Sequence, residues 1–183
     1  MYNNYKTVCL NSISNNFYSN FIKKFHYKKS LARGCKYNYC LFIDNKLAGI
    51  ACYGIPSSKN YNGGKIIELK RFTLSPRCLK NTASWFMSKC EKLLPKEIES
   101  IISYAESDRH EGTIYKASNF TFMGQGKRGQ AVMYKGKQYH LKAVYQKIKG
   151  KPTKTSKMIK DNLKCGKAKW VTTSAKNIYI YKR

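Results

Sequence analysis

Acidic residues are scarce in this sequence. Only 9 Asp and Glu stand against 36 Lys and Arg, which gives a formal net charge of +27. An AT-rich coding sequence would explain why Lys outnumbers Arg, but it would not explain the missing Asp and Glu. A charge imbalance of this size attracts polyanions at long range. It favours nucleic acid as the partner, with a ribosome-like particle or an anionic membrane surface as alternatives.

Long apolar runs and closely paired cysteines are also missing. No window approaches the length of a transmembrane span, and the N-terminal MYNNYKTVCLNS has no apolar run of signal-peptide length. The 7 cysteines are odd in number, and no pair has the C-x-x-C spacing of a zinc ribbon. Apolar surroundings such as YNYCLFI are typical of buried, reduced thiols. These absences predict a soluble cytoplasmic protein, and we expect nucleic acid and no membrane as its partner.

The few acids that are present cluster. Glu106, Asp108 and Glu111 lie within six residues, and after Glu111 no carboxylate appears until Asp161. A protein with so little negative charge has no general reason to concentrate it in one segment. The cluster therefore indicates a site with a specific need for carboxylates.

The C-terminal third is the most basic part of the chain. Residues 121–183 contain 17 Lys and Arg and a single acid, Asp161. Apolar and aromatic residues interleave with these charges, which favours a folded basic face that follows phosphates over a floppy arm. At 183 residues with 42% hydrophobic content, the chain is long enough for a core of its own. We expect a single domain, residues 1–183, whose last third is strongly basic.

Apolar periodicity predicts an alternation of strands and helices. In chain order we expect a helix at 13–25, a hairpin at 37–55, a strand at 65–75, a helix at 83–94, a strand at 100–106, a short helix at 112–120, a pair of strands at 121–140, short helices at 142–150 and 155–166, and a strand at 176–183. This order predicts an α/β (α+β) fold with a mixed central sheet flanked by helices. Ligands of such sheets bind beyond the carboxyl ends of the strands, which would place Ser75–Thr82 and Glu106–Gly112 on one rim.

Five segments resemble the Mom-type DNA adenine-modification proteins of bacteriophages. They are FHYKKS, ELKRFTLSP, KNTASWF, ISYAESDRHEGTIYKASNF and GKQYHLKAVY, in the order that the family has them. The most specific piece is GTIYKASNF after a strand that ends in Tyr-Ala-acid, and the resemblance runs from about His26 to the final NIYIYKR. It implies a GCN5-related N-acetyltransferase (GNAT) fold. It also implies an enzyme that converts the exocyclic amine of adenine in duplex DNA to a carbamoylmethyl-type derivative and so shields phage DNA from host restriction.

The resemblance assigns roles to residues by motif position. Arg71, Ser84, Asp108, Tyr115 and His26 match positions that are functional in the family. The family usually has Tyr-Ala-Asp at the strand end, whereas this chain has Tyr-Ala-Glu followed by Ser-Asp, so two acids compete for one role. The candidate catalytic residues are Asp108, Glu106, His26 and Tyr115. If the chain is encoded by a phage, the place of action is the host cytoplasm.

The loop that would hold a donor departs from the wider acyltransferase fold. That fold normally has Arg/Gln-x-x-Gly-x-Gly/Ala, whereas RCLKNTAS has no glycine. The predicted helix start still offers backbone N–H groups and a positive dipole. We expect acetyl-CoA or another acyl or aminoacyl donor there. The candidate cofactor-binding residues are Arg71, Asn81, Thr82 and Ser84.

Chemistry at adenine needs an acid, an aromatic platform and a basic surface. The amine is a poor nucleophile because its lone pair is delocalised into the ring, and a carboxylate such as Asp108 could accept its proton. The base must also leave the duplex, and Tyr27, Tyr104 or Tyr115 could stack on it. The candidate nucleic-acid contacts are Tyr27, Lys127, Arg128, Lys135, Lys137 and Lys142.

Each candidate also has a purely structural interpretation. Asp108 could cap the helix that follows it, and Glu106 could pair with a neighbouring Lys. His26 and Tyr115 could be core residues. Arg71 alternates with apolar residues, so it should be at least half-buried and would need an anionic partner, either Glu106 or a cofactor phosphate.

Metal binding and two other functions stay open. His26, Asp108 and His110 could form a two-His-one-carboxylate iron site, although nothing in their spacing demands one and no metal ligand is assigned. A GNAT-type N-acetyltransferase acting on aminoacyl-tRNA, protein or a small-molecule amine would share the fold but should have the glycine-rich loop. A non-enzymatic nucleic-acid-binding protein would explain the charge but not the acid cluster.

Overall fold

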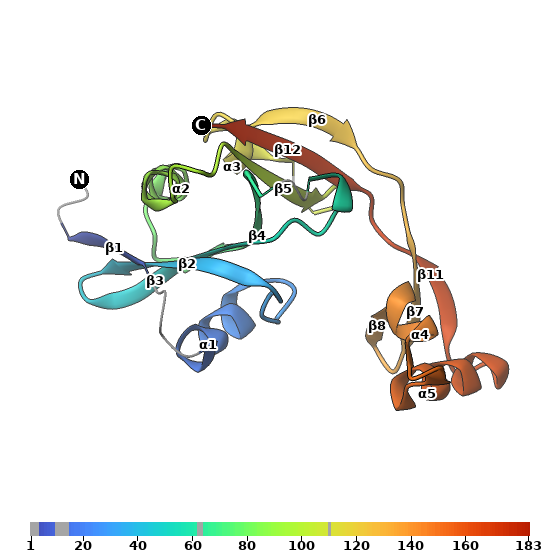
Figure 1. Ribbon diagram of the computed structural model, residues 1–183. Helices are drawn as coiled ribbons and strands as arrows, with labels where there is room; N and C mark the ends of the chain where they lie inside the picture. The colour runs from blue at the N-terminus through green and yellow to red at the C-terminus, as the bar shows by residue number, and fades with distance from the viewer. Residues whose placement is uncertain (1–3, 10–14, 62–63, 110) are drawn as a thin grey trace. The chain divides into compact units, whose positions relative to one another are not determined.

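The computed structural model describes residues 4–9, 15–61, 64–109 and 111–183 (Figure 1). The chain divides into two compact units, each with its own apolar core. The first unit comprises Met1–Ala105, His110–Gly124 and Asn177–Arg183, and the second comprises Glu106–Arg109 and Gln125–Lys176. That the two together form the single domain expected from the chain length stays a prediction.

A seven-stranded mixed sheet dominates the first unit. Its order is β1 (Tyr5–Cys9), β2 (Cys35–Ile43), β3 (Lys46–Gly54), β4 (Ile66–Leu74), β5 (Ser100–Glu106), β12 (Lys176–Lys182) and β6 (Thr121–Gln125). Strands β1 to β4 are antiparallel neighbours, whereas β4 and β5 run parallel. The mixed α/β sheet expected from the element order is confirmed.

The hairpin between β2 and β3 forms where the sequence predicted it. Its two linking residues, Asp44 and Asn45, have φ angles of 49° and 58°. Two positive φ angles in succession characterise the type I′ turn, whose twist matches that of the flanking strands. Asp and Asn tolerate this conformation better than most residues, so the local sequence selects the turn.

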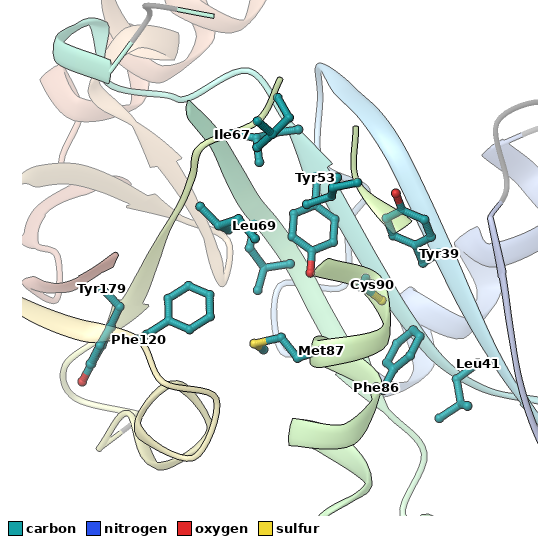
Figure 2. Packing of buried hydrophobic residues seen from close by; sticks show 14 of the residues in the cluster. Tyr39, Leu41, Tyr53, Ile67, Leu69, Phe86, Met87, Cys90, Phe120 and Tyr179 are labelled. Atoms are coloured by element: carbon teal, nitrogen blue, oxygen red, sulfur yellow. The ribbon is translucent and has the colours of Figure 1, made fainter. Parts of the chain in front are cut away.

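Helices cover both faces of this sheet (Figure 1). On one face, α2 (Thr82–Leu93) buries Phe86, Met87 and Cys90 against the sheet, where Figure 2 shows Tyr39 and Tyr53. On the other face, α1 (Asn15–Phe25) packs against alternate strand residues. Because neighbouring strand residues point to opposite faces, one apolar strand supplies both cores. The predicted helices at 13–25 and 83–94 are thereby confirmed in their described parts.

The second unit is a small sheet covered by two helices. The sheet has the order β11 (Lys169–Thr172), β7 (Gln130–Tyr134), β8 (Lys137–His140). Helices α4 (Leu141–Tyr145) and α5 (Lys154–Lys164) enclose a core of Val132, Val144, Ile159 and Ala168. Between the helices lies a two-stranded hairpin, β9 (Lys147–Ile148) and β10 (Lys151–Pro152).

Two expectations for the C-terminal half are corrected. Residues 121–140 form three strands, of which β6 joins the large sheet beside β12 while β7 and β8 pair with each other. The helix expected at 142–150 stops at Tyr145, because Gln146 adopts an extended conformation (φ −65°, ψ 128°) and the next residues form a β-hairpin. Local patterns reveal a strand but not its partner.

Two shorter elements complete the description. The short helix predicted near residue 113 is α3 (Thr113–Lys116), and a 3₁₀ turn, η1, covers Lys59–Tyr61. The six cysteines whose side chains are described are all free thiols, as expected, although Cys165 is exposed. In the described part of the chain, no helix has both the length and the apolar character that crossing a membrane would require.

Candidate functional site

The two parallel strands of the first unit stop pairing halfway along. The register of β4 with β5 runs from Ile66 opposite Ser100 to Leu69 opposite Ser103, although both strands continue beyond that point. A β-bulge lies at the same place in β4, because Cys52 is opposite Arg71 while Tyr53 is opposite Leu69. A bulge bends its strand and re-aims its side chains. The strand ends therefore lack their mutual ladder, and backbone groups here can meet a ligand.

Ser103 and Tyr115 mark the end of that pairing. The Ser103 Oγ lies 3.3 Å from the Leu69 carbonyl oxygen and 2.9 Å from the Tyr115 hydroxyl. The Tyr115 ring stacks on Tyr179, with centroids 4.6 Å apart. Burial raises the pKa of Tyr115, so its phenol stays protonated at neutral pH. The structure thus places this candidate as a neutral hydrogen-bonding group beside the strand ends.

A polar cluster occupies the neighbouring positions of β4 and β5. The buried Glu68 carboxylate accepts a hydrogen bond from the Ser57 N–H at 2.5 Å and lies 3.6 Å from Lys70 Nζ. Burial, with the Glu68 charge as a second cause, raises the pKa of Tyr104 to about 12. A side-chain hydrogen bond with Ser58 opposes this rise only in part. The sequence analysis missed Glu68, although an acid within an apolar strand was a usable indication.

Arg71 is half-buried, as expected, but its partners are not anionic. Its Nε donates to the Ser30 carbonyl at 3.0 Å, and one terminal nitrogen donates to the Lys70 carbonyl at 2.7 Å. Glu106, one of the two partners expected, instead lies 3.3 Å from Arg109. Main-chain carbonyls carry partial negative charge and satisfy a guanidinium without a counter-ion. The expected ion pair between Arg71 and Glu106 is therefore wrong.

The N-terminus of α2 offers main-chain N–H groups to a ligand rather than side chains. Asn81 adopts the left-handed conformation at φ 65° and makes no side-chain cap. Thr82 is fully buried, with its hydroxyl 3.3 Å from that of Tyr5. The Ser84 hydroxyl donates back to the Asn81 carbonyl at 3.1 Å. The Thr82 N–H already donates to the Leu79 carbonyl at 3.2 Å, so contact with an acyl donor would come from the other first-turn N–H groups, which have no acceptor within the helix.

His26 and Tyr27 lie directly after α1. His26 is 8% exposed, and its Nδ1 accepts a hydrogen bond from the Lys28 N–H at 3.1 Å. The two rings stack with centroids 4.6 Å apart, and Tyr27 is 37% exposed. An Nδ1 that accepts a main-chain proton cannot ligate a metal at the same time. The core interpretation of His26 agrees with this burial, while Tyr27 keeps an accessible ring.

Two members of the acid cluster, Glu106 and Asp108, belong to the second unit, where hydrogen bonds hold Asp108. Asp108 Oδ1 lies 3.0 Å from Ser107 Oγ and 3.5 Å from an Arg128 terminal nitrogen. Hydrogen bonds from Ser174 and Ser107, helped by the Arg128 charge, lower the pKa of Asp108. Asp108 does not cap the following helix, because the capping residue of α3 is Gly112. A carboxylate with a lowered pKa is a weak base and a good hydrogen-bond acceptor.

Metal ligands are not assembled in the described residues. No group of three or more His, Cys, Asp or Glu there is placed to hold a metal ion. His110, the third member of the iron site considered from the sequence, lies outside the described residues. The described part of the chain therefore provides no support for iron.

The basic candidates all lie on the surface of the second unit. Within Gln125–Lys176 there are 15 Lys and Arg and one acid. Lys135 and Lys137 extend over the rings of Tyr134 and Tyr139, with Nζ 5.6 Å and 5.1 Å from the ring centroids. These cation–π contacts hold the two ammonium groups over the aromatic rings. The exposed candidates are Lys127, Arg128, Lys135, Lys137 and Lys142.

Solved structures place the fold among the GNAT acetyltransferases. A GNAT family acetyltransferase from Elizabethkingia anophelis with acetyl-CoA bound is 8% identical, at a TM-score of 0.53 over 99% of each chain. The ribosomal-protein-S18-alanine N-acetyltransferase from Escherichia coli is 7% identical, at a TM-score of 0.50 over 97% of this chain and 94% of that one. A GNAT acetyltransferase from Streptococcus pneumoniae matches at 0.47 with 11% identity, over 80% of this chain and 65% of that one. At these identities the likeness concerns the fold.

The sequence itself identifies the family within that fold. The model of the Mom protein family matches residues 7–182, which is nearly the whole chain. This chain therefore belongs to the Mom protein family, as the resemblance of its segments predicted. No curated protein has significant sequence similarity to it.

Proposed function

We propose that this protein is a transferase that converts the N6 amine of adenine in duplex DNA to a carbamoylmethyl-type derivative. In a phage, this modification would protect the genome from host restriction nucleases. The observation that carries the proposal is membership of the Mom family over residues 7–182. The basic surface of the second unit supports DNA as the substrate, because exposed Lys and Arg with interleaved aromatics suit a phosphate backbone.

Asp108 is the residue that we propose to act on the amine. In the reaction, N6 forms one bond to carbon, loses one proton, and the leaving group departs from the donor. With its lowered pKa, Asp108 is ionised at neutral pH and can accept a hydrogen bond from the amine. Asp108 accepts the N6 proton while the new N6–carbon bond forms. Because that bond makes the N6 proton acidic, a weak base is sufficient at this stage. Glu106, held by Arg109, is the alternative acid.

Tyr115 and Arg71 have supporting roles in this proposal. The Tyr115 phenol, hydrogen-bonded to Ser103, can donate to an oxygen of the transferred group near the strand ends. The Arg71 guanidinium, tied to two carbonyls, keeps the bulged part of β4 in place. His26 is a positioning residue for Tyr27, whose exposed ring can stack on a base.

An acyl-CoA or aminoacyl compound is the donor class that the fold favours. One structural neighbour of this fold has acetyl-CoA bound. In this chain, the N-terminus of α2 follows a loop with exposed Arg77 and Lys80, which suits a phosphate group. The loop lacks glycine, so backbone contact with a pyrophosphate would be less close than in glycine-rich loops. Attack of N6 on the carbonyl carbon of such a thioester or ester would expel the thiol or alcohol and give an N6-acyl adenine. A carbamoylmethyl product, in which N6 is bonded to a methylene carbon, would then require rearrangement of a transferred glycyl group, which is its isomer.

Nucleoside mass spectrometry tests the function directly. DNA from cells that express the wild type should contain a new adenine species, and its mass identifies the transferred group. DNA from cells that express soluble, folded Asp108→Ala should lack this species, whereas purified Asp108→Ala should bind duplex DNA at least as tightly as the wild type. Unmodified DNA with the folded wild type would reject DNA modification. That result would favour an acetyltransferase acting on aminoacyl-tRNA, protein or a small-molecule amine.

A further inference from the structure

One short segment of the second unit is exposed along its whole length. All eight residues from Tyr145 to Pro152 are exposed, and they include three Lys and no acid. Ile148 is 63% exposed and Tyr145 is 57% exposed. Neither apolar side chain contributes to the core of this unit. Apolar groups presented among lysines on a hairpin indicate contact with something outside the chain.

The geometry of this segment is that of a tight hairpin. Ile148 is opposite Lys151, and Lys147 is opposite Pro152, across the two-residue turn of Lys149 and Gly150. Both turn residues have positive φ, 47° and 77°, so the turn is of the type I′ kind. Ile148 thus sits beside the tip with a lysine next to it in the sequence and another across the hairpin.

The base of the hairpin is fixed by hydrogen bonds, one of which is buried. The Thr153 N–H donates to the Gln146 carbonyl at 3.1 Å, and the Thr153 hydroxyl accepts from the Ser156 N–H at 3.1 Å as the cap of α5. The buried Ser156 hydroxyl donates to the Val144 carbonyl at 2.5 Å. These bonds connect the hairpin to the core between α4 and α5, so its tip is presented rigidly and little entropy is lost on binding.

We propose that this hairpin is a wedge for duplex DNA, in which Ile148 enters a base step while Lys147, Lys149 and Lys151 contact backbone phosphates. The inference rests on the proposed function and adds to it a surface that would help to extrude the target base. Side chains that wedge between base pairs partly unstack and kink the duplex. An enzyme that acts on a paired base needs such unstacking, because the target base must leave the stack before it can react. Charge complementarity selects a polyanion as the occupant, and a duplex offers both stacked bases and two rows of phosphates.

The first experiment separates the wedge from simple charge attraction. A duplex with 2-aminopurine beside the target adenine reports unstacking as a rise in fluorescence, while anisotropy reports affinity. Ile148→Ser should abolish most of the fluorescence rise and weaken binding about three- to tenfold, because a serine side chain is too small and polar to wedge between the bases. Ile55→Ser is the matched control, because Ile55 lies in the first unit and is 62% exposed. It should behave as the wild type.

The second experiment counts phosphate contacts. The triple change of Lys147, Lys149 and Lys151 to Gln should lower the slope of log K against log salt by up to about 3, since each contact contributes about 0.9. The equal charge loss of Lys89→Gln, Lys92→Gln and Lys96→Gln on exposed residues of the first unit should change the slope much less. A folded Ile148→Ser with wild-type fluorescence and affinity overturns the wedge. The wedge is also overturned if the triple Lys→Gln variant of the hairpin loses binding to phosphatidylserine vesicles but binds the duplex as the wild type does.

The failures of the two proposals are distinguishable. If modified adenine forms in cells but Ile148→Ser unstacks DNA as the wild type does, the wedge is wrong and the proposed function stands. If the wild type unstacks the duplex in a way that depends on Ile148 but no modified nucleoside forms, the function is wrong and the wedge stands.

Discussion

At the scale of single residues, the buried carboxylate of Glu91 is the clearest case of a group whose environment opposes its charge. It lies in α2, it is 7% exposed, and one of its oxygens has no hydrogen-bond partner within the described chain. Burial raises the pKa of Glu91 to about 7 from 4.5, and the Arg183 charge opposes that shift only in part. Glu91 therefore titrates in the neutral range, unlike ordinary surface acids.

Glu91 should make the protein less stable as the pH rises. Between pH 4.5 and about 7 the unfolded chain releases this proton while the folded chain retains it, so the free energy of unfolding falls across that window. The loss should approach about 3 kcal/mol, since one pKa unit corresponds to about 1.4 kcal/mol. Glu91→Gln should raise the melting temperature at pH 8 and leave it nearly unchanged at pH 4. The control is Glu97→Gln on an exposed residue, and an equal shift at both pH values would contradict the prediction.

At the scale of elements, the beginning of α3 shows how one glycine positions a candidate catalytic side chain. Gly112 has φ 77°, and a Cβ built there would lie 1.8 Å from the Tyr179 hydroxyl. Tyr179 in turn stacks on Tyr115. Both the backbone angle and the available space require glycine at this position. Gly112 therefore lets the start of α3 lie close to Tyr179, which stacks on Tyr115.

Gly112→Ala should destabilise the protein by more than a left-handed alanine alone. Gly136→Ala is a suitable comparison, because Gly136 has φ 70° and no atom within 4 Å of its built Cβ. Gly136→Ala should cost about 1–2 kcal/mol, the usual penalty for a left-handed residue. Gly112→Ala should cost several kcal/mol and change the near-ultraviolet circular dichroism of the tyrosines. Equal melting temperatures for the two variants would mean that Tyr179 moves away freely.

At the scale of the whole molecule, charge is distributed unevenly over the two units. Of the 9 acids in the chain, only Glu106, Asp108 and Asp161 belong to the second unit. In the first unit, acids such as Glu68 and Glu99 have lysine partners. The second unit has far more cations than acids to pair them with. An unbalanced surface of this kind binds polyanions through release of their counter-ions.

Duplex affinity should fall steeply with salt. If the five exposed basic candidates each neutralise one phosphate, they alone should contribute about −4 to −5 to the slope of log K against log salt, so affinity should drop at least several hundredfold between 50 and 200 mM salt. Lys135→Gln with Lys137→Gln should reduce the slope by about 2 with little dependence on DNA sequence. Binding that is insensitive to salt would rule out this surface as the DNA contact.

The sequence by itself determined the family, the α/β class and most elements. The hairpin at 37–55, the helix at 83–94 and the strand at 100–106 follow from apolar periodicity and from turn residues such as Asn45. Periodicity and turn preference are local properties, and the helices and strands they produce depend on few distant contacts. The scarcity of acids and the motif order likewise needed no coordinates.

Only the tertiary structure decided which strands pair and what each site residue contacts. It inserts β12 between β5 and β6, turns Thr82 inward to Tyr5 and gives Asp108 its partners Ser107 and Arg128. Burial of Glu68 and the hydrogen bond of Ser103 to Tyr115 also appear only there. Each of these is a contact between residues distant in sequence or a consequence of local side-chain orientation. Such contacts depend on how whole elements pack, and apolar periodicity carries no information about which element a strand or helix will meet.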